Sequence, residues 1–467
     1  MQINKALQGF KSAFFQNSIA MNLNLNSYKH LVAPLILLAA ALLISFNFLA
    51  FAADEYTYMN TASAIARGNY ADAPELSRFP LFPAILSVFF AIFGTSEIVA
   101  KLVNLLIALA GVVILYFVAR KLFGEEVAGI AALILATNPL YIFFSSRVLT
   151  EPLYIIFLTL AVYFLYRVKD DLKNLIWFGA ATAFAILTRY LALYLGIIAV
   201  TWLGVNGQLQ NVIRSKWLYI GIIAFFVVLA PWLYLSYAAT GNPFGFIIEF
   251  GLRQAQQQGV GFGLPDKIPS NLLAAPFVIG APLVFASFLL RREIRDKFMK
   301  NDAIKFLLLA SIVIALTLEL AGFFRPSLLR YIAVIVPFLA MMAAFIYSSV
   351  RNERIKIAIF SINAKQILFA AIAVNLALSL GLIAFFGGYG YEKQVAYRQA
   401  GLYLKDNCNS TYGNIESVAQ FYTGKQPAAD ATGAHCLAYS FYDGLNPSIP
   451  QGFAEVYRYG KVAVYKK

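Results

Sequence analysis

The chain has 467 residues, of which 60% are hydrophobic and only 13% are charged, and its mean hydropathy is +0.70. Soluble globular domains are closer to half apolar and a quarter charged, so this composition excludes a soluble globule and predicts a polytopic membrane protein. The net charge of +14 does not indicate nucleic-acid binding, because basic residues in cytoplasmic loops account for it.

The first long apolar run ends in two acidic residues. Residues 1–30 are mostly polar and basic, which predicts a cytoplasmic N-terminal tail. Residues 31–53 are apolar over a length that crosses a bilayer as one helix. Asp54 and Glu55 follow at once. A carboxylate at the mouth of a membrane span is costly to desolvate and marks a candidate functional site.

The rest of the chain is dominated by further apolar runs, which together with the first predict about eleven spans. They cover residues 98–119, 127–145, 152–166, 173–188, 190–205, 217–240, 272–290, 303–323, 331–350 and 366–387. Basic residues gather near 167–169, 214–216, 291–297 and 351–365. Basic loops stay in the cytoplasm, so the N-terminus is predicted inside and the C-terminus outside. The transmembrane domain is predicted to occupy residues 31–387.

One apolar stretch, residues 79–93, conflicts with this alternation of loops. It is short, contains Pro80 and Pro83, and ends at Gly94. We interpret it as an in-plane helix within a long external loop over residues 54–97. The alternative is a true span, with a re-entrant segment elsewhere restoring the parity.

Residues 388–467 differ in character and are predicted to form a small external α/β domain. A glycine-rich segment at 387–390 reads as a break, a helix is expected over 392–407, and short strands are expected near 436–441 and 461–465. The chain's two cysteines, Cys408 and Cys436, both lie in this segment. An external location favours a disulfide between them, and two buried free thiols are the alternative.

Other charged residues on the predicted external side could complete a site. They are Arg78, Arg147, Glu151, Arg189 and Arg330. Carboxylates serve as general bases or metal ligands, and arginine matches phosphate oxygens in a bidentate manner. The alternative for Glu151 is a polar cap at the membrane interface. For Arg189 it is a side chain that extends toward the interface.

The order of these motifs resembles a known family. Asp54-Glu55, the segment Arg78 to Pro83, Ser146-Arg147 with Glu151-Pro152, and Arg330-Tyr331 resemble polyprenyl-phosphate-sugar-dependent glycosyltransferases of the GT-C fold. The protein mannosyltransferase-like branch, which uses dolichyl-phosphate-mannose, is the most similar. Phe79 stands where many members have proline, so phosphate contact by Arg78 departs from the family pattern.

The resemblance implies a role for each matching residue. Asp54 would be the catalytic carboxylate that activates the acceptor, and Glu55 would assist or orient it. Asp54 and Glu151 would be the ligands of a divalent cation, where one is used. The resemblance makes Arg78, Arg147 and Arg330 candidates for binding the lipid phosphate. Arg189 is a further candidate because a charge between two apolar runs is costly.

The predicted function is therefore transfer of a hexosyl or pentosyl group from a polyprenyl-phosphate donor, with inversion, on the external face of the cell membrane. The acceptor would be a protein, a lipid or a glycan. Lipid-phosphate sugars carry their own leaving group, and the sequence contains no nucleotide-binding motif. The alternatives are a polytopic transporter and a non-catalytic subunit with the same fold. No internal repeat of the kind common in transporters is evident.

Overall fold

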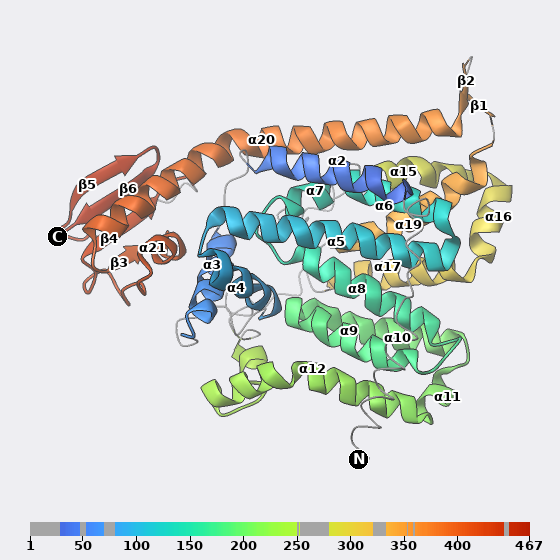
Figure 1. The fold of residues 1–467 in the computed structure, drawn as a ribbon, viewed down its shortest axis with the longest axis horizontal. Helices are drawn as coiled ribbons and strands as arrows, with labels where there is room; N and C mark the ends of the chain where they lie inside the picture. The colour runs from blue at the N-terminus through green and yellow to red at the C-terminus, as the bar shows by residue number, and fades with distance from the viewer. Residues whose placement is uncertain are drawn as a thin grey trace.

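A computed structural model describes residues 29–46, 53–69, 80–249, 252, 280–320, 333–352, 354–357, 360–442 and 448–467. They form a helical bundle with a small sheet at one end (Figure 1). The helices before the middle of the chain are α2 (Lys29–Ser45), α3 (Ala53–Ala66), α4 (Leu81–Phe93), α5 (Glu97–Phe123), α6 (Glu125–Thr137), α7 (Pro139–Ser145), α8 (Glu151–Arg167), α9 (Asn174–Thr188), α10 (Tyr194–Val205), α11 (Leu209–Ile213) and α12 (Lys216–Thr240).

The second half adds fewer and shorter bundle helices and one very long one. These are α15 (Ala281–Ala286), α16 (Arg292–Lys300), α17 (Asp302–Leu320), α19 (Val336–Val350), α20 (Ala364–Asn407) and α21 (Glu416–Thr423). Among the described residues, the 3₁₀ turn η3 (Tyr190–Leu193) joins α9 to α10, η4 (Ser287–Leu290) joins α15 to α16, and η6 (Ala333–Ile335) directly precedes α19. A hairpin of β1 (Arg354–Ile357) and β2 (Phe360–Asn363) precedes α20.

Within the described residues, four helices are long and apolar enough to cross a membrane, or five if α6 and α7 form one bent span. Five shorter apolar helices accompany them. The chain is thus a multi-pass integral membrane protein, while the predicted number of about eleven spans stays a prediction. The helix α4 has 13 residues, which is short for a span, and it lies beside α3 at one end of the bundle (Figure 1).

The apolar run 127–145, expected to be one helix, is two helices bent by 61°. Asn138 causes the bend locally, since its side chain caps α7 by accepting the backbone N–H groups of Leu140 and Tyr141. Pro139 occupies the first turn of α7, where a missing N–H costs nothing.

The break expected at 387–390 is absent, because α20 continues through these glycines for 44 residues. A glycine costs about 1 kcal/mol relative to alanine inside a helix, which weakens the helix there without ending it. A capping box of Asn363 and Gln366 begins α20. The helix is long enough to belong both to the bundle and to the small C-terminal unit (Figure 1).

The C-terminal sheet has four strands in the order β3 (Thr411–Gly413), β4 (Cys436–Ser440), β6 (Val462–Lys466) and β5 (Ala454–Tyr459). The pair β3–β4 is parallel and the other two pairs are antiparallel. The strands predicted near 436–441 and 461–465 are confirmed as β4 and β6. A disulfide joins Cys408, at the end of α20, to Cys436 at the start of β4.

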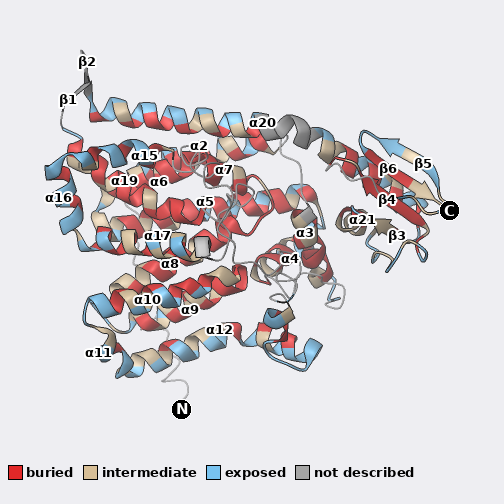
Figure 2. Cartoon of the chain, turned by 180° about the vertical axis from the view of Figure 1, so that it is seen from behind, coloured by how far each residue is buried: buried red, intermediate tan, exposed pale blue. Residues whose placement is uncertain are grey.

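The two ends of the bundle differ in a way that bears on topology. The segments predicted to be cytoplasmic, which include α11, α16 and the β1–β2 hairpin, lie together at one end, and α3, α4, α21 and the sheet lie at the other (Figure 1). Buried residues line the interior of the bundle and continue into α3 and the sheet (Figure 2). The end with α3 therefore carries both the acidic pair and the C-terminal unit.

Candidate active site

The acidic pair occupies the first turn of α3. Negative side chains are favourable there, because the unpaired N–H groups of a helix N-terminus carry partial positive charge. Asp54 is half-buried, whereas only 1% of the Glu55 side chain is exposed. The two carboxylates therefore sit in different environments although they are adjacent in the chain.

Glu55 is held by the turn between α7 and α8. Arg147 Nε donates to Glu55 Oε1 at 2.7 Å, and the backbone N–H of Val148 donates to Glu55 Oε2 at 3.1 Å. Both carboxylate oxygens are thus engaged by one turn. The Arg147 side chain is 20% exposed, so it remains partly accessible from solvent.

The backbone of this turn is held in place by a side chain of α5. The Asn104 side-chain amide, fully buried, donates to the backbone carbonyls of Ser145 and Arg147, the first at 2.9 Å. Buried carbonyls need such partners, because an unsatisfied one costs about 1–3 kcal/mol. Asn104 therefore positions the backbone that carries Arg147.

A second carboxylate–arginine pair lies on the other side of the same turn. Arg189, between α9 and η3, donates to Glu151 Oε1 at 2.6 Å and to the Thr150 hydroxyl at 3.2 Å. The side chains of Arg189 and Glu151 are only 4% and 1% exposed. Charges this deep are tolerated only when they are paired and hydrogen-bonded.

The structure thus brings together four of the residues predicted from the sequence, as the pairs Glu55–Arg147 and Glu151–Arg189, next to Asp54. Arg78 and Arg330 lie outside the described residues. The divalent-cation role fits poorly, since Glu151 already neutralises the Arg189 guanidinium. Among the described residues there is also no group of three or more His, Cys, Asp or Glu side chains placed to hold a metal ion.

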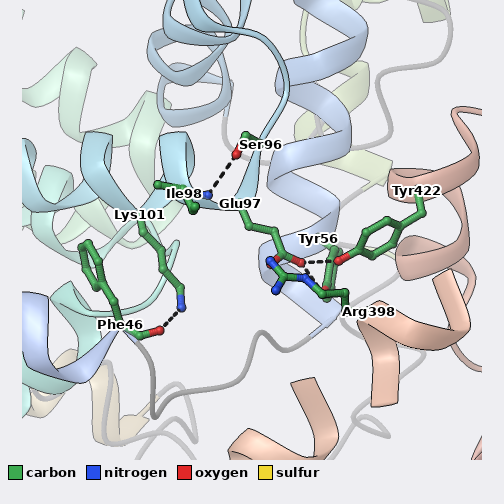
Figure 3. Close-up of polar contacts among 8 residues, drawn as sticks. All are labelled: Phe46, Tyr56, Ser96, Glu97, Ile98, Lys101, Arg398 and Tyr422. Carbon is green, nitrogen blue, oxygen red and sulfur yellow. Dashed lines mark hydrogen bonds and ion pairs between the residues drawn. The ribbon is translucent and has the colours of Figure 1, made fainter. Parts of the chain in front are cut away.

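Sequence reasoning missed three polar residues of α5, namely Glu97, Lys101 and Asn104. A signal was present, because spacings of four and three place them on one face of an otherwise apolar helix. All three are buried. Lys101 donates to the backbone carbonyl of Phe46 at 2.5 Å, and Glu97 is the centre of a hydrogen-bond cluster with residues from α3, α20 and α21 (Figure 3).

Comparison with known families supports the resemblance predicted from the sequence. Residues 72–235 match the family described as dolichyl-phosphate-mannose-protein mannosyltransferase. The match spans Glu97, Arg147, Glu151 and Arg189, and it begins after Asp54 and Glu55. No curated protein sequence matches the chain.

Solved structures share the fold over most of the chain. ArnT from Cupriavidus metallidurans, bound to undecaprenyl phosphate, matches with a TM-score of 0.68 and 16% identity, covering 93% of this chain and 97% of that one. Its apo state gives a TM-score of 0.66 at 15% identity over the same shares. The Archaeoglobus fulgidus oligosaccharyltransferase, tethered to an acceptor peptide with the sequon NVT, matches with a TM-score of 0.54 and 14% identity, over 87% of this chain and 64% of that one.

Proposed function

We propose that this chain is a membrane glycosyltransferase of the lipid-phosphate-sugar type, similar to the dolichyl-phosphate-mannose-protein mannosyltransferases, and that Asp54 is its catalytic base. The sugar would pass from a polyprenyl phosphate to an acceptor hydroxyl or amine at the end of the bundle where α3 lies. The observation that carries the proposal is the difference in burial within the acidic pair. Glu55 is buried against Arg147 and Val148, whereas Asp54, in the same helical turn, is only half-buried.

In this proposal Asp54 takes the proton from the acceptor as its oxygen or nitrogen attacks the anomeric carbon. The bond from that carbon to the phosphate oxygen breaks, and the polyprenyl phosphate leaves with both electrons. A base on the face opposite the leaving group gives inversion at the anomeric carbon. Glu55 orients Asp54 by fixing the first turn of α3 against the α7–α8 turn.

Arg147 is our candidate for the lipid phosphate among the described arginines. Negative charge develops on the phosphate as it leaves, and a guanidinium aimed at that charge lowers the barrier. Arg147 combines partial exposure with a fixed position beside the acidic pair. Arg189 is assigned a structural role instead, because its guanidinium is buried against Glu151 and Thr150.

The donor is a polyprenyl-phosphate-linked sugar, by analogy with the undecaprenyl phosphate bound to the ArnT structure. We assign the end of the bundle that carries α3 and the sheet to the external face of the cell membrane, and the N-terminus to the cytoplasm. The disulfide agrees with this side, because disulfides persist in oxidising compartments. No step of the proposed reaction runs through a metal ion.

The test is transfer by the purified protein from a panel of polyprenyl-phosphate sugars, read as release of lipid phosphate. Asp54→Asn should lower the turnover by at least about 10³-fold while the protein still folds, because a base is lost and the shape is kept. A matched control is Asp302→Asn, which makes the same change in the first turn of α17, where the carboxylate is 63% exposed. Normal turnover by Asp54→Asn would overturn the assignment.

A further inference from the structure

The carboxylate of Glu97 gathers hydrogen-bond donors from three separate elements. Glu97 is the first residue of α5. The Tyr56 hydroxyl from α3 donates to Glu97 Oε1 at 3.0 Å, and the Tyr422 hydroxyl from α21 donates to the same oxygen at 2.6 Å. The Arg398 guanidinium from α20 donates to Oε2 at 3.1 Å. Figure 3 shows the four side chains converging, so four helices meet at one carboxylate.

Tyr56 and Glu97 are buried, Tyr422 is half-buried, and Arg398 is the most exposed member of the cluster. The Glu97 side chain is 7% exposed and that of Arg398 is 51% exposed. Burial, followed by the nearby Glu97 charge, raises the pKa of both Tyr56 and Tyr422 above the usual 10.0, so both hydroxyls remain protonated donors at physiological pH. A buried carboxylate is stable only with such partners, which makes this contact specific in its geometry.

Apolar packing continues across the same boundary. The Tyr56 ring meets the Phe421 ring edge to face, with centroids 5.5 Å apart. The Asn60 side-chain amide donates to the Ser417 carbonyl at 2.8 Å. A single buried apolar cluster runs from α3 and α4 through the end of α20 into α21 and the sheet. The C-terminal unit is therefore docked on α3 through a shared core.

The docking contact and the proposed base lie in one turn of α3. Asp54, Glu55 and Tyr56 are consecutive, and neighbouring side chains of an α-helix point about 100° apart. Glu55 ties this turn to the α7–α8 turn, while Tyr56 ties it to α5 and α21. Lys101, one turn along α5, interacts electrostatically with the carboxylates of both Glu55 and Glu97. The first turn of α3 is thus held from two sides.

We propose that Glu97 is a positioning residue for the transfer reaction: it docks the C-terminal unit onto α3 and so fixes the turn that presents Asp54. This inference rests on the proposed role of Asp54. The C-terminal unit then supports the reaction through its contact with α3. Misplacing a reacting group by about 1 Å can cost about 10²-fold in rate.

The experiment uses the full-length chain with Glu97→Gln and, as a milder change, Tyr422→Phe. The matched control is Glu455→Gln, which removes a carboxylate bound to Arg458 on the exposed edge strand of the same sheet. For each protein one measures kcat, the KM for the polyprenyl-phosphate sugar, the thermal midpoint, and hydrogen exchange in a peptide covering residues 53–69.

Glu97→Gln should lower kcat by about 10- to 100-fold with little change in KM, since positioning of the base affects the chemical step. Exchange in residues 53–69 should become faster at an unchanged thermal midpoint. Tyr422→Phe should give the same pattern with a few-fold loss, and Glu455→Gln should behave as the wild type.

Two results would overturn the proposal: a normal kcat in Glu97→Gln despite faster exchange in α3, or a low kcat with unchanged exchange there. If Glu97→Gln fails to fold, Tyr422→Phe decides by the same criteria, because it removes one hydroxyl and keeps the ring. A wild-type chain without transfer activity would count against the proposed function instead, and the exchange data would still decide whether Glu97 docks the C-terminal unit.

Discussion

The two carboxylate–arginine pairs beside the α7–α8 turn have the same chemistry and different surroundings. In Glu55–Arg147 the arginine is 20% exposed, whereas in Glu151–Arg189 it is 4% exposed. The first pair sits at the mouth of the bundle beside Asp54, and the second is sealed between helices. A charged residue at the end of a span can therefore serve the proposed reaction, as Arg147 does, or stabilise the fold, as Arg189 does. The exposed fraction of the arginine side chain distinguishes these two roles.

The largest effect is expected when the buried pair Glu151–Arg189 loses one of its two charges. Arg189→Met should destabilise the protein by about 3–5 kcal/mol, because Glu151 would remain buried without its cation. The measurement is the thermal midpoint and the yield of monodisperse protein. The double variant Glu151→Gln/Arg189→Met should recover most of the loss. A single variant as stable as the wild type would contradict the structural role.

A second test exchanges arginine for lysine in both pairs. Arg147→Lys keeps the charge beside Glu55 but loses the planar fork that suits phosphate, so transfer should fall by about 10- to 100-fold while the thermal midpoint changes little. Arg189→Lys is the matched control, and it should lower stability without changing the turnover per folded molecule. Equal effects of the two variants on turnover would remove the distinction between the pairs.

The smallest expected effect concerns the turn that both pairs share. Asn104→Leu removes the amide that donates to the Ser145 and Arg147 carbonyls, so it should cost about 1–3 kcal/mol in stability. Transfer should fall several-fold, because the Arg147 backbone loses its support. Thermal unfolding and turnover measured side by side check this. An unchanged turnover would show that the turn keeps its position without Asn104.

Several residues of the candidate site could be located from the sequence, because charged residues are costly next to a membrane and therefore conspicuous in it, while their roles in the reaction stay predictions. This is why Glu55, Arg147, Glu151 and Arg189 were found, together with the family resemblance. The pairing was not predictable. Which arginine meets which carboxylate depends on how α3, α8 and α9 pack, and local sequence does not encode that.

The fold, like the site, could be predicted from the sequence only in part. Apolar runs predicted helices in the right places, yet the Asn138-Pro139 bend and the continuity of α20 through its glycines depend on caps and packing. The Glu97 cluster was out of reach for a further reason. Its partners, Arg398 and Tyr422, are roughly 300 residues away along the chain, so only the folded structure reveals them.

The length of α20 has a mechanical consequence. At about 1.5 Å per residue, its 44 residues have a contour length of roughly 66 Å, longer than the about 40–45 Å of a bilayer with its head groups. The helix runs along the bundle from the β1–β2 hairpin and then bends toward the unit docked on α3 (Figure 1). Because this helix also supplies Arg398 to the Glu97 cluster, continuous helical backbone and not a linker joins the bundle to the docked unit.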